Sequence, residues 1–146
     1  MHQTAWVPEY AREYLAQINR PYNYEDLLTM AKRQQELEEK MSHSANKLLF
    51  CDTGPLILKV WSMNKFGKCD PWILELWGNC NYDLIFLCGT EVPWEEDPLR
   101  ENPDDRDVLY EIYKRELEAS SRKFFVLKGT IEERVEMVQK KILQMI

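Results

Sequence analysis

Short apolar runs alternate with amphipathic segments along the whole chain. The apolar, β-prone runs fall at residues 4–7, 47–51, 83–88 and 123–127. Apolar residues at helical spacing occupy residues 9–18, 24–43, 56–63, 104–120 and 130–145, and a further helix follows Asp70. The runs at 47–51 and 83–88 are continuously apolar, which favours strands covered on both faces. Strands that alternate with helices predict an α/β fold, with a mostly parallel sheet and helices on both of its faces.

Capping signals mark the expected starts of several helices. Asn23 precedes the long helix as its N-cap, and Asp70 followed by Pro71 opens another helix. Thr130 and Glu133 form a capping box at the last helix.

Length and composition are those of an ordinary globular protein. The chain has 146 residues, of which 45% are hydrophobic and 30% charged, so we expect a single domain over residues 1–146. No apolar run approaches the roughly 18 residues of a membrane span. The first ten residues also lack the pattern of a signal peptide. The sequence therefore predicts a cytoplasmic protein with no membrane partner.

The negative charge is concentrated in one segment. The net charge is −6, and residues 91–107 hold eight acids and two arginines, so the rest of the chain sums to about zero. No basic face is indicated, and this argues against a nucleic-acid partner. The segment is rich in proline and charge. We therefore expect a lid at residues 91–121, made of this loop and the helix that follows it.

Candidate chemistry lies where the predicted strands end, because open parallel sheets bind ligands outside the carboxyl ends of their strands. Asp52 and Thr53 directly follow the predicted strand at 47–51. An acid at that place either holds Mg²⁺ or orients an attacking hydroxyl group. The alternative is that Asp52 caps the next helix, and the sequence leaves both open.

Four charged residues offer further candidate contacts. Arg100 and Arg106 lie in the acidic lid, where they either meet transferring phosphate oxygens on closure or pair with acidic neighbours. Glu9 and Arg12 share one face of the first helical turn. They either grip ribose hydroxyl groups or form a surface ion pair.

Aromatic side chains could stack on a flat base, although most of them are expected in the core. The set comprises Trp6, Tyr10, Tyr14, Trp61, Trp72, Trp77 and Trp94. Trp94 lies in the polar lid, where burial is less expected. We assign Trp94 and Tyr10 as candidate substrate-binding residues.

These pieces together resemble the ribosylnicotinamide kinase domain of the NadR-type NAD-salvage proteins and the wider P-loop AAA ATPase group. The resemblance covers essentially the whole chain. It rests on PEYARE (8–13), LLFCDT (48–53), FGKCDPW (66–72), YDLIFL (82–87), PWEEDPLR (93–100) with Arg106, and FFVLKGTIEERV (124–135).

The resemblance implies ATP-dependent transfer of a phosphoryl group to a small nucleoside such as nicotinamide riboside, with ATP and Mg²⁺ as cofactors. The implied roles are nucleoside contact for Glu9 and Arg12, catalysis or Mg²⁺ binding for Asp52 with Thr53, and phosphate contact for Arg100 and Arg106.

One motif of that group is absent from the chain. Its members begin with a strand, a GxxxxGK[ST] loop that cradles the ATP phosphates, and a helix. None of the five glycines here begins such a loop. The resemblance thus implies a truncated form that lacks roughly 30 residues. The lost central strand would stabilise a sheet by on the order of 10 kcal/mol. We therefore expect a chain that is unstable alone or that pairs residues 47–51 with residues 83–88.

Three hypotheses follow for the function. The chain is the truncated or inactive form of an ATP-dependent nucleoside kinase, or it is a non-catalytic remnant that binds a nucleoside or a protein. The third hypothesis is an interaction protein that self-associates through the acidic lid and exposed sheet edges.

Overall fold

The structure, a computed structural model, describes residues 5–90 and 106–145. The chain forms two compact units, Met1–Cys80 and Asn81–Ile146. Each unit is helix-rich and contains one pair of parallel strands. The interpretation of residues 1–146 as a single domain stays a prediction.

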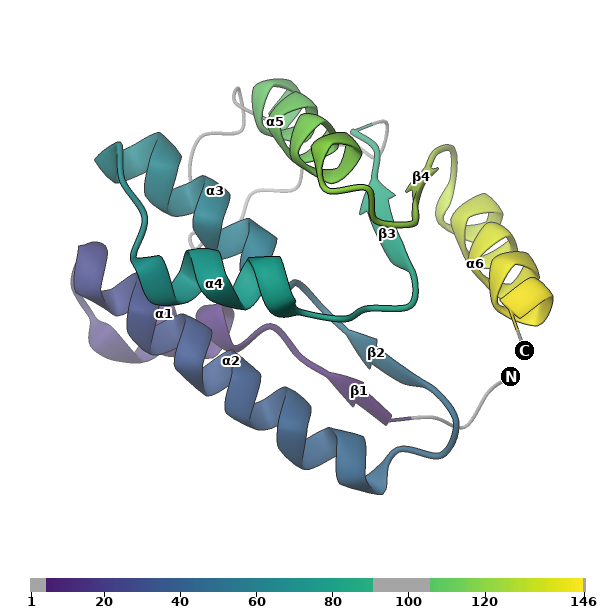
Figure 1. Ribbon diagram of the computed structural model, residues 1–146, viewed down its shortest axis with the longest axis horizontal. Helices are drawn as coiled ribbons and strands as arrows, with labels where there is room; N and C mark the ends of the chain where they lie inside the picture. Colours follow the sequence, from purple (N-terminus) through teal and green to yellow (C-terminus); the bar gives the residue numbers. More distant parts are fainter. Residues whose placement is uncertain (1–4, 91–105, 146) are drawn as a thin grey trace. The chain divides into compact units, whose positions relative to one another are not determined.

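The first unit combines a parallel strand pair with four helices (Figure 1). In chain order the elements are β1 (Ala5–Val7), α1 (Tyr10–Ile18), α2 (Tyr24–Ser44), β2 (Leu49–Cys51), α3 (Pro55–Phe66) and α4 (Pro71–Asn79). Ala5 lies opposite Leu49 and Val7 opposite Cys51. The Asp52 amide donates to the Val7 carbonyl at 2.9 Å, so the ladder continues one residue past β2. The carboxyl ends of both strands therefore meet at one edge.

Helix α2 organises the first unit. It contacts both strands and the other three helices of the unit, and Figure 1 shows it running beside β1. Its apolar side chains Leu27, Met30 and Ala31 fall on one helical face and are at most 2% exposed. The core cluster that they form also contains Ala11, Leu58 and Ile73. One face of a single helix thus joins the elements that surround the strand ends.

The second unit repeats the strand-and-helix alternation. It contains β3 (Ile85–Cys88), α5 (Arg106–Ala119), β4 (Phe124–Leu127) and α6 (Ile131–Met145). The two strands are parallel, with Ile85 opposite Phe124 and Cys88 opposite Leu127. Among the helices of the described residues, none combines the length and the apolar character that crossing a membrane requires.

The predicted helix starts are confirmed. Asn23 forms a capping box with Asp26 at the start of α2, and Asp70 accepts a hydrogen bond from the Trp72 amide at 2.8 Å. The Thr130 hydroxyl accepts from the amide of the third residue along, at 3.2 Å. Each cap involves residues within three positions of one another, which is why the sequence alone could indicate it.

The parallel direction of the strands is confirmed, but their pairing and burial differ from expectation. The strands form two separate pairs, and the expected pairing of residues 47–51 with residues 83–88 is not found in the described part of the chain. Nor are β2 and β3 covered on both faces, since Phe50 is 37% exposed and Cys88 is exposed. A two-stranded sheet has too little area to bury both faces of a strand.

The expected burial of the tryptophans is correct only in part. Trp77 is buried, and Trp61 packs against the core. Trp6 and Trp72 are 58% and 36% exposed, so the expectation of core positions is wrong for these two. Trp6 lies on a strand and alternates with the buried Val7, so its side chain points to the opposite face of the strand pair.

A buried carboxylate ties α1 to α2. The Arg20 guanidinium donates to both oxygens of Asp26, at 2.7 and 3.0 Å. The Tyr14 hydroxyl donates at 2.6 Å and the Asn23 amide at 2.7 Å. The Arg20 guanidinium, with help from the Tyr14 and Asn23 hydrogen bonds, holds the pKa of Asp26 well below its usual range. These bonds replace the water that the carboxylate loses on burial.

We expect Asp26→Asn to lower the free energy of unfolding by about 1–3 kcal/mol, because the amide has no charge and keeps one acceptor oxygen for the donors of Arg20, Tyr14 and Asn23. Urea denaturation followed by tryptophan fluorescence measures this change. The matched control is Glu36→Gln on the same helix, which removes only a surface pair with Arg33 at 3.4 Å. Its effect should stay below about 0.5 kcal/mol. Equal effects of the two substitutions would contradict the assigned role of Asp26.

The same carboxylate makes stability depend on pH. Its folded pKa lies below the unfolded value of about 3.9, so its contribution is complete above that value and is lost as pH falls through the folded pKa. The free energy of unfolding of the unaltered chain should therefore fall more steeply from about pH 5 to pH 2 than that of Asp26→Asn. Urea titrations across this range measure both slopes, and parallel slopes would show that Asp26 is not the group responsible.

Candidate functional site

A hollow opens at the carboxyl ends of β1 and β2, which is the edge where an open parallel sheet binds ligands. Its walls come from the β1–α1 turn, α2 and the start of α3. The lining residues are Glu9, Ala11, Met30, Gln34, Thr53, Gly54, Ile57 and Leu58. The hollow encloses about 250 Å³ with its open side included. The room that it leaves for the centre of a water molecule is only about 10 Å³, enough for about one water, so the hollow is a shallow depression that a ligand group would contact from its open side.

Glu9 lies at the N-terminus of α1. It occupies the N-cap position with an extended backbone, φ −68° and ψ 106°, and its side chain makes no capping bond to the helix. The first amide of the helix, that of Tyr10, instead donates to the side-chain oxygen of Gln34 at 2.8 Å. Glu9 is half-buried and lines the hollow, and its side chain does not serve as the helix cap.

Thr53, in the turn between β2 and α3, has an unusual backbone conformation. Its φ is +68°, in the left-handed region that β-branched residues rarely adopt. Such a conformation costs on the order of 1–3 kcal/mol and is found most often at binding sites. Gly54 follows as the N-cap of α3, with Pro55 in the first turn of that helix.

Asp52 is exposed and belongs to the turn between β2 and α3. The N-cap of α3 is Gly54, so Asp52 does not occupy the capping position that the alternative gave it. The Asp52 carboxylate and the Thr53 hydroxyl are both oxygen donors, the class of ligand that Mg²⁺ takes from proteins together with substrate phosphates. Within residues 5–90 and 106–145, no group of three or more His, Cys, Asp or Glu side chains is close enough to hold a metal ion.

The other candidate residues of the first unit lie on α1, next to Glu9. Tyr10 packs against Tyr14 with ring centroids 6.0 Å apart, and Arg12 is exposed in the first turn of α1. Neither side chain is part of the hollow's lining. Their roles in substrate binding stay predictions, as do those of Glu9, Asp52 and Thr53.

In the second unit, two arginines donate to the loop after β3. Arg106, the first residue of α5, donates to the Thr90 carbonyl at 3.0 Å. Arg134 of α6 donates to the Gly89 carbonyl at 3.2 Å and to the Gly129 carbonyl at 3.1 Å. The predicted lid arginine Arg106 thus lies at the carboxyl end of β3. Trp94 and Arg100 lie outside the described residues, as does the lid segment 91–105.

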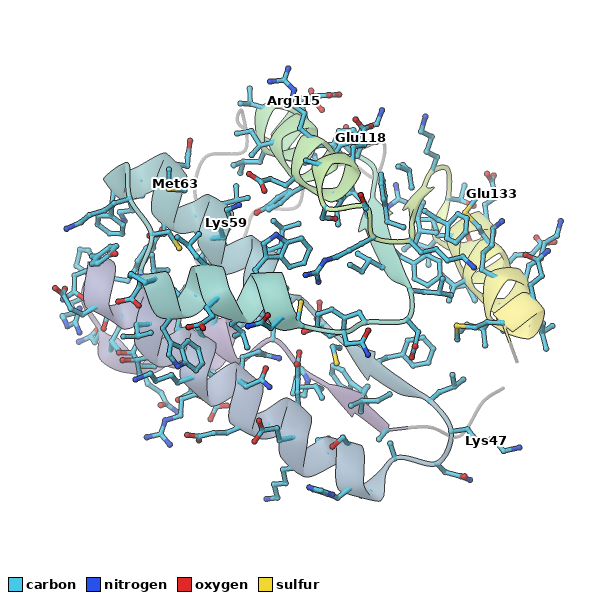
Figure 2. The ribbon with its side chains drawn as sticks, viewed as in Figure 1. Lys47, Lys59, Met63, Arg115, Glu118 and Glu133 are labelled. Atoms are coloured by element: carbon cyan, nitrogen blue, oxygen red, sulfur yellow. The ribbon has the colours of Figure 1, made fainter. Side chains whose placement is uncertain are left out.

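The sequence analysis did not select Arg134. It joins the loops that follow both strands of the second unit, and the shape of the second loop depends on Gly129. That glycine has φ +88°, and a Cβ added to it would clash with the carboxylate of Glu133, which Figure 2 shows at the start of α6. The sequence does show a glycine next to a helix start, which suggests a positive φ there. It does not show which carbonyl groups Arg134 reaches.

Cys51 is the last residue of β2, directly before Asp52. Burial, and then the nearby Glu38 carboxylate, raises the pKa of the Cys51 thiol to about 12. Cys88 ends β3 in the corresponding position of the second unit and is exposed. Both thiols are free rather than joined in disulfides.

We expect iodoacetamide at pH 8 to modify Cys88 at least about 100-fold faster than Cys51, because only the thiolate reacts and burial raises the pKa of the Cys51 thiol far above that pH. Mass spectrometry of peptides from timed reactions measures both rates. In 8 M urea the two thiols should react alike, which controls for intrinsic reactivity. Similar rates in the folded chain would contradict the burial of the β2 end.

Comparison with known protein families identifies the family of the chain. A family model described as an AAA domain matches residues 1–134, which include both strand pairs and the residues of the hollow. No curated protein matches the chain. The matched region extends over more than nine-tenths of the sequence, so the chain belongs to the AAA domain family, whose members are P-loop domains of the ATPase type.

Proposed function

We propose that the first unit carries the nucleoside-binding side of an ATP-dependent nucleoside kinase, with nicotinamide riboside as the representative acceptor. The observation that carries this proposal is the hollow at the ends of β1 and β2, with Glu9 among its lining residues. Membership of the AAA domain family supports nucleotide binding and phosphoryl transfer as the general activity. The acceptor class and the roles of the individual residues are the proposal's own content.

Carboxylates suit the acceptor side of such a reaction. A ribose presents vicinal hydroxyl groups, which donate hydrogen bonds to a carboxylate, and charge-assisted bonds of this kind are the strong ones. Glu9 is one of the residues that line the shallow hollow, and the proposal places the ribose over its open side. The exposed Arg12, one turn along α1, is the proposed second contact to the nucleoside. Tyr10 and Trp94 are the proposed surfaces for the base.

The phosphate side of the proposal rests on oxygen donors and arginines. When bound, ATP would supply the phosphoryl group, and Mg²⁺ would neutralise part of the negative charge on the phosphate oxygens. Asp52 and Thr53 would hold the ion through their side-chain oxygens, and Asp52 is the proposed acid that orients the acceptor hydroxyl. Arg106 and Arg100 are the proposed contacts to the phosphate oxygens, where guanidinium groups bind well.

A second candidate function is nucleoside binding without turnover. It is favoured by the composition of the polypeptide, because none of its five glycines begins a GxxxxGK[ST] loop. The backbone amides, lysine and hydroxyl of that loop form most of the ATP-phosphate site in P-loop enzymes. We therefore propose that the 146-residue polypeptide binds the nucleoside and, by itself, does not phosphorylate it.

The test is isothermal titration of the full chain with nicotinamide riboside. We expect binding, and we expect Glu9→Gln to weaken it about 10- to 100-fold, since it replaces a charge-assisted bond with a neutral one. The matched control is Glu13→Gln, one turn along α1, where the carboxylate is exposed and bonds only Gln17 at 3.3 Å among the hydrogen bonds described for it. That control should bind like the unaltered chain.

Two outcomes would count against the proposal. A folded chain that does not bind nicotinamide riboside would remove the acceptor assignment, and equal affinities for the Glu9→Gln and Glu13→Gln variants would remove Glu9. A separate incubation with Mg²⁺–ATP decides between the two candidate functions. Phosphorylated nucleoside in that reaction would show that the polypeptide is catalytic without a GxxxxGK[ST] loop.

A further inference from the structure

We infer that Gln34 is a positioning residue that fixes Glu9 at the wall of the hollow. The inference rests on the proposed nucleoside-binding role of Glu9 and extends it to a residue 25 positions away, on another helix. Gln34 is one of three buried polar side chains in the described part of the chain and is 7% exposed. A buried amide must have partners, so where its two polar atoms bond is informative.

Both atoms of the Gln34 amide bond the backbone on either side of Glu9. Its oxygen accepts from the Tyr10 amide at 2.8 Å, and its nitrogen donates to the Pro8 carbonyl at 3.3 Å. The opposite orientation of the amide would place donor against donor and acceptor against acceptor, so these partners fix one orientation. Glu9 is therefore held between two backbone anchors that share a single side chain.

The first anchor takes the place of a helix cap. The first amides of an α-helix have no partner within the helix, and the N-cap side chain usually accepts from one of them. Here the N-cap is Glu9, and its side chain makes no capping bond. Gln34 supplies the acceptor instead. An acid at the N-cap can therefore line the hollow while the start of α1 remains satisfied.

The second anchor fixes the entry to the turn. Pro8 has a restricted φ and no amide hydrogen, so its carbonyl is the group through which the chain before Glu9 can be held. Gln34 extends from α2, whose neighbouring face forms the core. The backbone at Glu9 is thereby anchored to the helix that contacts every other element of the unit. A side chain on an anchored backbone loses less freedom when it binds a ligand.

The test uses Gln34→Met, which keeps the length of the side chain and removes both bonds, with Gln35→Met as the control. Gln35 is the next residue on α2, and its amide donates to Glu39 on the surface at 3.3 Å. We expect ¹⁵N relaxation to show lower order parameters at Glu9 and Tyr10 in Gln34→Met only. We also expect nicotinamide riboside to bind Gln34→Met about tenfold more weakly, with no change for Gln35→Met.

A double-mutant cycle separates positioning from general stability. If Gln34 acts through Glu9, Glu9→Gln combined with Gln34→Met should bind no more weakly than Glu9→Gln alone. Losses that multiply would overturn the inference, as would unchanged order parameters at Glu9 and Tyr10. The relaxation measurement needs no ligand, so failure of the unaltered chain to bind nicotinamide riboside would remove the proposed function and still leave the position of Glu9 decided.

A second variant serves if Gln34→Met does not fold. Gln34→Glu keeps an oxygen that accepts from the Tyr10 amide and places a carboxylate oxygen against the Pro8 carbonyl. Order should then be retained at Tyr10 and lost at Glu9, with weaker nucleoside binding. Full order at both residues with unchanged affinity would overturn the inference.

Discussion

A polar group that leaves water must find hydrogen-bond partners, and helix α2 meets this constraint at two places that together fix α1. Near its start, Asp26 takes donors from Tyr14 and Arg20, in α1 and just after it. Two turns further along, Gln34 bonds Pro8 and Tyr10 at the other end of α1. Both side chains are less than one-tenth exposed. The short helix that carries the candidate nucleoside contacts is therefore held at each end by one long helix.

The positions of these two side chains, Asp26 and Gln34, have a consequence for the site. Apolar packing of Ala11 against Leu27, Met30 and Ala31 holds α1 on α2, but it is non-directional. Hydrogen bonds have preferred distances and angles, so they determine the rotation and register that packing leaves loose. The strand pair adds the opposite wall, since the Asp52 amide bonds the Val7 carbonyl and brings the β2–α3 turn beside the β1–α1 turn. The hollow lies where these two constraints meet.

The sequence predicted features of the fold that depend on near neighbours. Asn23, Asp70 and Thr130 cap their helices through bonds that reach three residues at most. The site depends on longer reach. Glu9 and Thr53 were found because each follows a predicted strand, and the carboxyl ends of parallel strands meet. In the sequence, Gln34 is not distinguishable from the other polar residues of a charged helix. Its hydrogen-bond partners lie 24 and 26 residues away along the chain.

The same limit explains the errors in burial. A continuous apolar run indicates that both faces of a strand are covered only when neighbouring strands and helices are present to cover them. In β2 the run is apolar, yet Phe50 is more than one-third exposed, because the described sheet has two strands. Hydrophobicity states what a side chain favours, whereas its burial is decided by the elements that surround it. The sequence of one strand does not show which elements will surround it.

The arrangement also bears on how nucleoside binding relates to the ATP-phosphate motif. The contacts described for the Glu9 turn come from α2 and from the β1–β2 ladder, and all of these residues lie within Met1–Cys80. None of them belongs to a GxxxxGK[ST] loop, which the 146 residues do not contain. The support for the proposed acceptor site is thus independent of the element that binds ATP phosphates in P-loop domains.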